Sequence, residues 1–419
     1  MLLIYSHNVT NRLKYTFDLI FKSVLGIEYD CTTDEDQLRK FQGAKISYGE
    51  NKIADELFYP SSELLFSTGI HPIADWNLSV QPADIFSASF FLATRYEEYL
   101  PFTTDQYGRF SARQCLAYQN GLLQKPLINI WAKEIQNKIS ERYPSFSLPQ
   151  KKYSHLPTID IDNAYAFLGK GFLRTAGGYL KAAIKFDRND LQKRKNVLSG
   201  KEKDPFDTYD LQFSIHKRYN LKPVYFFLLG DWAEHDKNLS YADPLMQALI
   251  KKIAQHAETG IHPSYASNRN PEKIKIEKER LGSLSGRSIH KSRQHFLKLR
   301  FPHTYRNLIA AGITDDYSMG FADEPGFRAG ICTPYKFYDL EKEEETDLTI
   351  HPFAIMDGTF NNYLKITPEQ AIEKVKLISN EIKNVNGQFV SVWHNEILGD
   401  WREWKGWGGF YEKVIQIVQ

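Results

Sequence analysis

Residues 155–162 read His-Leu-Pro-Thr-Ile-Asp-Ile-Asp, an apolar strand candidate that ends in two carboxylates, Asp160 and Asp162. Residues i and i+2 of a strand point to the same face, so both side chains can face one site. Two anions that close repel each other unless a cation neutralises one of them. The pair therefore favours a divalent metal, with one aspartate as ligand and the other as a base. The alternative is a polar strand end that is solvated in a loop.

After this stretch the chain alternates between strand and helix patterns. Asp243 and Pro244 predict the start of a helix over 244–257, and residues 367–370 form a capping box for a helix that runs to about residue 384. About seven βα repeats predict a barrel-like α/β domain with its active site at the carboxyl ends of the strands. The strand candidates are residues 156–161, 222–230, 259–262, 288–296, 314–319, 349–356 and 389–394.

The residues before this region have a different pattern. Short strands are predicted at 2–5, 45–48 and 64–66, and helices at 84–99 and 128–142. Residues 143–152 are polar and bracketed by prolines, as linkers often are. Because 419 residues exceed the usual size of one core, we expect two domains, residues 1–148 and 149–419.

Bulk composition is that of a globular protein. A net charge of +2 with 25% charged residues indicates neither a nucleic-acid partner nor a membrane surface. Three distant cysteines argue against a disulfide framework and a cysteine-based zinc site. No apolar run approaches the roughly 20 residues of a membrane span, and the first residues lack the basic segment of a signal peptide, so a cytoplasmic location is expected. The basic stretch 186–207 is predicted to be a solvated insertion or, alternatively, a contact for an anionic substrate.

Polar residues recur at the ends of four further strand candidates, where apolar packing does not explain them. One carboxylate and two imidazoles leave an open position on an ion such as Zn²⁺. Such an ion polarises a carbonyl and lowers the pKa of bound water, while a second carboxylate takes the water's proton and a histidine protonates the leaving group. The polar residues at these four strand ends are His262, Arg293, His295, Arg328 and His394.

Residues 150–419 resemble the polysaccharide deacetylase superfamily (NodB-homology, carbohydrate esterase family 4). The resemblance rests on Thr-Ile-Asp-Ile-Asp at 158–162, Glu-Thr-Gly-Ile-His at 258–262, Phe-Arg-Ala-Gly at 327–330 with Pro-Tyr at 334–335, and Val-Trp-His at 392–394. It is strongest to a divergent bacterial branch in which this domain follows an α/β module of unknown function. The implied fold is a distorted (β/α)7 barrel-like domain of the NodB type, preceded by a smaller α/β domain. The implied roles are base for Asp160, metal ligand for Asp162 and His262, orientation of the base for Arg328, and general acid for His394.

The chain departs from the family pattern in two places. Ile161 separates the two aspartates, and Ala266 stands where the family has its second metal histidine. The branch carries an Arg-x-His segment on the following strand, which residues 293–295 match, so His295 is predicted as the third ligand. Asp357, after another strand, is predicted to pair with His394 or Arg328 and to set its protonation.

The resemblance implies a metal-dependent hydrolase that removes an acetyl group, N-acetyl rather than O-acetyl, from a sugar, an oligosaccharide or a polysaccharide precursor. Zn²⁺ is the expected ion, and one aspartate with two histidines also accommodates Co²⁺ or Ni²⁺. One alternative is a catalytically silent carbohydrate-binding relative. Another is a glycosyltransferase with an Asp-x-Asp metal site, which explains neither the strand-end histidines His262 and His295 nor the terminal His394.

Three further groups are candidates for function, and two of them have two readings each. Residues 84–100 and 105–110 resemble the accompanying module, and their charged residues predict either an interdomain salt-bridge network or part of a substrate cleft. Asp236 and Asn238 are candidates for hydrogen bonds to sugar hydroxyls. Four tryptophans predict a stacking platform for a sugar or a cap on the barrel. The charged residues are Arg95, Glu97, Glu98, Asp105 and Arg109, and the tryptophans are Trp393, Trp401, Trp404 and Trp407.

Overall fold

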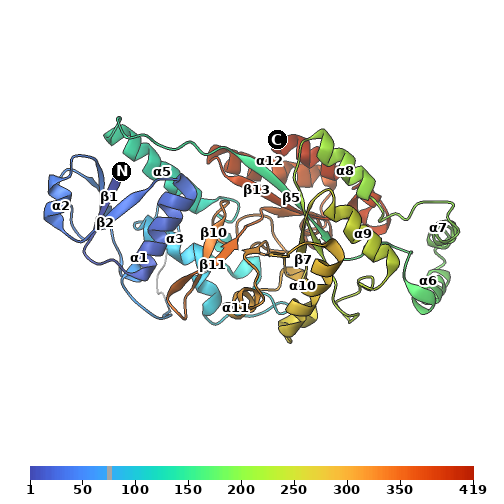
Figure 1. The fold of residues 1–419 in the computed structure, drawn as a ribbon. Helices are drawn as coiled ribbons and strands as arrows, with labels where there is room; N and C mark the ends of the chain where they lie inside the picture. The colour runs from blue at the N-terminus through green and yellow to red at the C-terminus, as the bar shows by residue number, and fades with distance from the viewer. Residues whose placement is uncertain (73–77) are drawn as a thin grey trace. The chain divides into compact units, whose positions relative to one another are not determined.

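The structure is a computed structural model that describes residues 1–72 and 78–419 (Figure 1). Contacts along the chain define two compact units. Unit 1 comprises Met1–His155, Leu297–Ile355 and Lys376–Val390, and unit 2 comprises Leu156–Phe296, Met356–Val375 and Ser391–Gln419. The chain therefore passes between the units more than once. The predicted domains 1–148 and 149–419 stay a prediction.

Unit 1 contains a parallel sheet in the order β2-β1-β3-β4. Its central strands β1 and β3 are buried along their whole length, as expected for parallel strands that are covered on both faces. The predicted strand at 64–66 is wrong, because Glu63–Leu65 forms a 3₁₀ turn. Three apolar residues are too few to define a period. The strands are β1 Leu2–Ser6, β2 Tyr29–Thr32, β3 Ala44–Gly49 and β4 Leu57–Pro60.

The helices of unit 1 follow the predicted pattern with one interruption. The helix predicted at 84–99 ends at Ala93, since Arg95 adopts a left-handed conformation (φ 55°) and a 3₁₀ turn over Tyr96–Tyr99 follows. A π-helical segment, Asp18–Leu25, continues the first helix. The helices are α1 Asn11–Phe17, α2 Glu35–Lys40, α3 Ile85–Ala93, α4 Leu116–Gln119, α5 Leu127–Arg142 and α11 His303–Ala310.

A hairpin lies in the second chain segment of unit 1. Strands β10 (Tyr335–Asp339) and β11 (Glu344–Ile350) pair antiparallel, and the short strand β9 (Asp315–Asp316) runs parallel to β11. The strand predicted at 314–319 is therefore shorter than expected. The strand predicted at 349–356 splits into the end of β11 and the two-residue strand β12 (Ile355–Met356).

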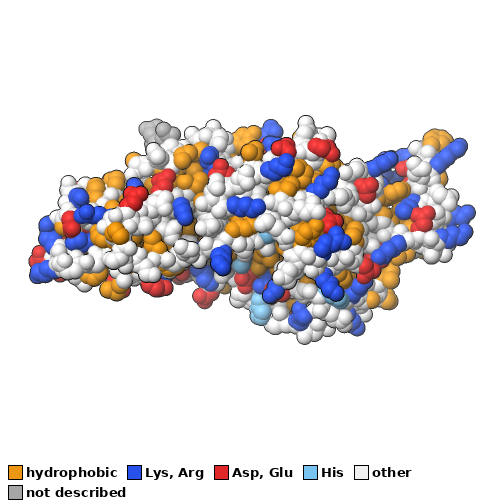
Figure 2. Space-filling view, turned by 90° about the horizontal axis from the view of Figure 1, so that it is seen from above, with side chains coloured by type: hydrophobic (Ala, Val, Ile, Leu, Met, Phe, Trp, Pro, Cys, Tyr) orange, Lys and Arg blue, Asp and Glu red, His pale blue; other side chains and the backbone are white. Residues whose placement is uncertain are grey.

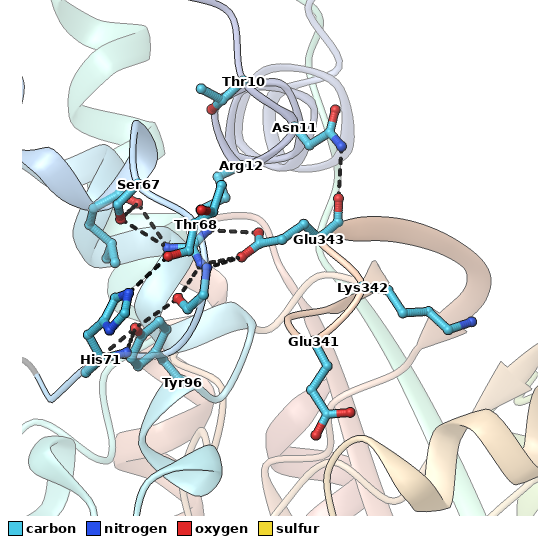
Figure 3. A network of polar contacts seen from close by, with 12 residues as sticks. Thr10, Asn11, Arg12, Ser67, Thr68, His71, Tyr96, Glu341, Lys342 and Glu343 are labelled. Carbon is cyan, nitrogen blue, oxygen red and sulfur yellow. Dashed lines mark hydrogen bonds and ion pairs between the residues drawn. The ribbon is translucent and has the colours of Figure 1, made fainter.

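The turn of this hairpin is held by a buried arginine of α1 (Figure 3). Arg12 is 1% exposed, and its Nε donates to Glu343 Oε2 at 2.8 Å while its Nη2 donates to the Gly69 carbonyl at 2.6 Å. The backbone amide of Gly69 donates to the other carboxylate oxygen of Glu343 at 2.9 Å. These bonds join three distant stretches of chain, which explains why residues 297–355 belong to the same unit as the N-terminal segment.

The sheet of unit 2 carries the aspartate pair on its strand β5. Strands β5 to β8 run parallel in the order β8-β7-β6-β5, with β13 next to β5. The register pairs Asp160 with Phe226, and Phe226 with Gly260. The strands are β5 Ser154–Ile161, β6 Val224–Phe227, β7 Glu258–Ile261, β8 Lys291–Ser292 and β13 Gln388–His394. The strand predicted at 288–296 is thus reduced to two residues.

Helices separate these strands, and their predicted starts are confirmed. Asp243 Oδ1 accepts from the Leu245 amide at 2.8 Å, and Thr367 and Gln370 exchange the two bonds of a capping box. Helix α9 buries Met246, Leu249, Ile250 and Ile253, a helical spacing that places one apolar face on the core. The helices are α6 Gly171–Ile184, α7 Arg188–Leu198, α8 Tyr209–Arg218, α9 Pro244–Ala254, α10 Glu272–Ser285, α12 Pro368–Asn384 and α13 Phe410–Val418.

The α/β class with parallel strands is confirmed. In residues 1–72 and 78–419 no closed barrel is found, so the predicted (β/α)7 barrel is not confirmed. None of the helices in these residues combines the length and the apolar character that crossing a bilayer requires.

Gly260 provides a test of the sheet packing. A Cβ atom added there would lie 2.6 Å from Cε1 of Phe226 and 2.7 Å from the Lys291 carbonyl oxygen. Gly260→Ala should therefore lower the free energy of unfolding by about 1–3 kcal/mol in urea titrations. Gly177→Ala is the control, because a Cβ there meets no described atom within 4 Å and should raise helix stability by roughly 0.5–1 kcal/mol. Equal stability of Gly260→Ala and wild type would contradict this packing.

Candidate metal centre

The predicted site residues of unit 2 lie at strand ends. Asp160 is the penultimate residue of β5 and Asp162 follows that strand, while His262 comes directly after β7 and His295 lies three residues after β8. His394 is the last residue of β13. Because β5 to β8 run parallel, their carboxyl ends share one edge of the sheet, where sites of α/β proteins form.

Asp162, His262 and His295 form a group that can hold a metal ion. One ligand atom from each lies within 4.8 Å of the others. His262 Nε2 is 3.2 Å from Asp162 Oδ1, and His295 Nε2 is 3.5 Å from Asp162 Oδ2. Both histidines are buried, at 2% and 6% exposure. The two imidazoles therefore face opposite oxygens of one carboxylate.

Each imidazole is fixed through its second nitrogen. His262 Nδ1 is hydrogen-bonded to the Arg293 carbonyl oxygen, and His295 Nδ1 to Asp236 Oδ1 at 2.9 Å. A carbonyl and a carboxylate only accept, so both Nδ1 atoms carry the hydrogen. Each Nε2 is then directed toward Asp162. Metal-binding histidines are held in this way.

The spacing of the ligand atoms suits an ion. Two ligands about 2.1 Å from a tetrahedral Zn²⁺ lie roughly 3.4 Å apart, close to the separations of Asp162 from the two histidines. Asp162 Oδ1 is buried and lacks a hydrogen-bond partner among the described residues, although His262 Nε2 lies 3.2 Å away. A buried carboxylate oxygen without a donor is costly unless a cation compensates it. The residues therefore fit a divalent ion.

Electrostatics in the site point the same way. Burial lowers the pKa of His295, but Asp162 and Asp236 outweigh it and raise that pKa to about 9. Burial raises the pKa of Asp162, and the charge of His295 more than reverses this, so the pKa lies well below its ordinary value. The carboxylates of Asp162 and Asp236 thus favour positive charge between them. A bound ion would supply that charge and displace the imidazole proton, as metal binding does in general.

Asp160 is held by an arginine that lies two residues before the third candidate ligand. Arg293 Nη1 donates to Asp160 Oδ1 at 3.0 Å, and both side chains are buried. The Arg293 guanidinium also lies 4.8 Å from the centre of the Phe226 ring. Asp160 Oδ2 is 3.9 Å from His262 Nε2. A carboxylate is thus kept beside the ligand group by a charge-assisted hydrogen bond.

Arg328, which is predicted to orient the base, has a partner of its own within unit 1. Its Nε donates to Glu98 Oε1 at 2.8 Å and its Nη2 to Glu98 Oε2 at 2.5 Å, inside unit 1. Arg95 Nε donates to the same Glu98 at 2.8 Å, and all three side chains are buried. A buried carboxylate between two guanidiniums satisfies both arginines, so Arg328 is engaged there and Arg293 holds Asp160.

His394 has a buried carboxylate behind it. Its Nδ1 is 2.7 Å from Asp357 Oδ1, and its backbone amide donates to Asp357 Oδ2 at 2.7 Å. Its Nε2 lies 3.8 Å from Asp162 Oδ2. Burial lowers the pKa of His394, but the fully buried Asp357 outweighs it, so the pKa lies well above its ordinary value. Of the two partners predicted for Asp357, the structure shows His394.

Two residues of the site, Asp236 and Arg293, have partners that the sequence does not predict. Asp236, expected to face sugar hydroxyls, is 1% exposed and accepts from the amides of Tyr265 and Ala266 as well as from His295. The sequence places Arg293 among the polar strand-end residues and in the Arg-x-His pattern, without a partner. That pattern was the available signal, since residues at i and i+2 share a face in extended chain. Their partners lie far away in sequence.

The other predicted groups are packed rather than open. Trp393, Trp404 and Trp407 are at most 4% exposed, which favours a packing role over a stacking platform. Asp105 pairs with Arg109 four residues on, and Arg95 Nη2 pairs with Glu97 at 2.8 Å. These charges form networks inside unit 1. Asn238 is buried and donates to the Gly230 carbonyl at 2.9 Å.

Comparison with known proteins gives a match at the N-terminus and remote structural likenesses. Residues 2–144 match a family of unknown function (DUF7033). No protein with a curated description matches the chain.

The structural likenesses are to proteins classed as polysaccharide deacetylases. The one from Mycobacterium smegmatis is 15% identical, with 65% of this chain and 86% of that chain covered and a TM-score of 0.41. The one from Pseudomonas aeruginosa PAO1 is 13% identical, with coverages of 63% and 83% and a TM-score of 0.37. A third, from Bacillus cereus, is 10% identical, with coverages of 64% and 86% and a TM-score of 0.31.

Proposed function

We propose that the chain is a metal-dependent hydrolase that removes an acetyl group, N-acetyl rather than O-acetyl, from a carbohydrate. One observation carries the proposal: a carboxylate and an imidazole, each with its own buried partner, stand beside the three-residue ligand group. The group is Asp162, His262 and His295, and the flanking pairs are Asp160 with Arg293 and His394 with Asp357.

The ligand set supports a catalytic ion rather than a structural one. Three protein ligands leave a coordination position open, as catalytic zinc sites do. Zn²⁺ is the first candidate, and Co²⁺ or Ni²⁺ suit the same donors. When bound, the ion would polarise the acetyl carbonyl and lower the pKa of a bound water.

Asp160 is proposed as the base. Arg293 fixes the direction of its carboxylate through the 3.0 Å bond to Oδ1, which leaves Oδ2 on the side of His262. A carboxylate in this position accepts the proton of the attacking water. The water oxygen then forms the new bond to the acetyl carbon.

His394 is proposed as the acid. Its Nδ1 hydrogen is engaged by Asp357, so Nε2 is the atom that can donate toward the site. The buried Asp357 carboxylate stabilises the protonated imidazole, as buried partners of catalytic histidines do. Donation from Nε2 to the amide nitrogen lets the carbon–nitrogen bond break, giving acetate and a free amine.

The substrate class follows from the motif resemblance of residues 150–419. The test is acetate release from a panel of N-acetylated and O-acetylated sugars, paired with elemental analysis of the purified protein. Bound metal with acetate release supports the proposal. Sugar affinity without metal or release would instead indicate a silent binding relative, and activity that needs a nucleotide-sugar donor would indicate a glycosyltransferase.

Removal of either ligand histidine should remove the metal. His262→Ala and His295→Ala should each weaken zinc binding by more than the roughly 10–100-fold cost of losing an outer partner, with acetate release lost in parallel. Zinc content per chain and a competition titration measure this. His256→Ala is the control, because that exposed histidine bonds only to the Lys252 carbonyl among the contacts described for it and stacks on Phe213. Unchanged zinc affinity in His295→Ala would contradict the ligand set.

Removal of the acid should separate metal binding from turnover. His394→Ala should retain zinc and lose about 10²–10⁴-fold in kcat, the contribution of a positioned acid. Asp357→Asn should also keep zinc and lower kcat, since an amide no longer fixes the imidazole tautomer. Full activity of His394→Ala on a good substrate would rule out the acid role.

The two arginines should differ in what they change. Arg293→Met should lower kcat while zinc stays bound, because it releases Asp160 but keeps the backbone carbonyl that orients His262. Arg328→Met breaks a buried ion pair with Glu98 and should instead lower the free energy of unfolding by about 3–5 kcal/mol. Urea titrations and steady-state kinetics distinguish them. A kinetic defect in Arg328→Met but not in Arg293→Met would instead indicate that Arg328 orients the base Asp160.

A further inference from the structure

Helix α6 presents its apolar side to solvent. Amphipathic helices of globular proteins normally turn that side toward the core. Figure 2 shows hydrophobic and basic side chains together on the segment that Figure 1 labels α6 and α7. The exposed apolar side chains are Phe172 (85% exposed), Leu173 (83%), Leu180 (63%), Ile184 (68%) and, just after the helix, Phe186 (88%).

The packing of α6 on α7 fixes which side is outward. The inward side carries Ala182, the buried residue of α6, and Gly178 one turn earlier. A Cβ atom at Gly178 would lie 2.6 Å from the Arg194 guanidinium of α7, so the two helices approach closely there. At about 100° per residue, Leu173, Leu180 and Ile184 share the opposite side of the helix. Unit 2 therefore uses the small residues for packing and leaves the large ones outside.

A basic strip runs beside this apolar side. Arg174, Lys181 and Lys185 repeat the spacing of the apolar set one residue further along the chain. Residues 170–195 contain eight Lys or Arg and two Asp, a net charge of +6 in a chain whose total is +2. Both acids are engaged, since Asp187 caps α7 and Asp190 pairs with Arg194 of the segment and with Arg402 beyond it.

The space on the inner side of this strip is also basic. A cavity of about 660 Å³ is lined by more basic than acidic side chains, namely Lys170, Arg174, Lys181, Lys185, Arg194 and Arg402 against Asp187, Asp190 and Glu403. Burial, together with the neighbouring Arg174, lowers the pKa of Lys170 to about 8. Positive charge is therefore concentrated along one flank of a helix whose outer side is apolar.

We propose that α6 with Phe186 docks on the surface of a bilayer that contains anionic phospholipids. Helices that lie in a membrane interface combine large apolar side chains on one side with Lys and Arg along the polar side. The apolar side chains would enter the acyl boundary, while the lysine stems extend so that their charges meet the phosphates. A second copy of this chain fits less well, because it would bring the same positive strip against itself. The docking stands independently of the deacetylase chemistry.

The experiment is co-sedimentation of the purified full chain with vesicles. Vesicles of phosphatidylglycerol and phosphatidylcholine in equal parts should bind the protein, and vesicles of phosphatidylcholine alone should bind at least about tenfold less. Binding should weaken as NaCl is raised, because salt screens the basic strip. Absence of binding to the phosphatidylglycerol vesicles, or equal binding to both, would overturn the proposal.

Two double variants locate the surface. Leu173→Ser with Leu180→Ser should lower vesicle affinity by about tenfold or more, because binding no longer transfers two apolar side chains from water into the bilayer. Lys181→Glu with Lys185→Glu should lower binding to phosphatidylglycerol vesicles alone. Leu377→Ser is the matched control, because Leu377 is 61% exposed but lies on α12. Far-ultraviolet circular dichroism and urea titration should match wild type for all three.

Sedimentation equilibrium tests whether a second copy of this chain, rather than a membrane, covers the apolar side of α6. A monomer with and without the leucine substitutions agrees with membrane docking. A dimer that the leucine double variant converts to monomer, without vesicle binding by wild type, would assign this side of α6 to a second copy and overturn the proposal.

Discussion

The candidate site depends on one carboxylate placed between two imidazoles. Asp162 presents one oxygen to His262 Nε2 and the other to His295 Nε2, at 3.2 and 3.5 Å. Neither imidazole is free to turn away, because each Nδ1 is bonded to a buried acceptor. The negative charge of Asp162, whose Oδ1 is buried, is not balanced by neutral imidazoles and needs positive charge nearby. A divalent cation resolves that imbalance.

Beside this group, the proposed base Asp160 and the proposed acid His394 each have a buried partner of opposite charge. Arg293 donates a hydrogen bond to Asp160, while Asp357 stabilises the protonated form of His394. The proposed base and the proposed acid thus each have one fixed partner beside the ligand group. Unit 1 has a buried charge cluster of its own, in which Glu98 lies between Arg95 and Arg328. That cluster satisfies its own charges.

Much of this arrangement could be predicted from sequence, and the failures have physical causes. Strands β5 and β13, the helix caps and the aspartate pair come from local patterns, namely period-two alternation, capping residues and strand-end polarity. The partner of Arg328, Glu98, is 230 residues away, and nothing local in the sequence distinguishes Arg328 from Arg293. Asp236 is predicted to bind sugar hydroxyls because its partner His295, 59 residues away, is not visible in the local sequence. The short strands β8 and β9 have too few residues to carry a period.

Anomalous X-ray scattering at the zinc edge, from crystals of the protein grown with Zn²⁺, tests the metal centre most directly. The expected result is one strong peak about 2.0–2.2 Å from His262 Nε2, His295 Nε2 and an oxygen of Asp162. The absence of a peak there at saturating zinc, or a peak that excludes either histidine, would contradict the metal centre on which the proposed chemistry depends.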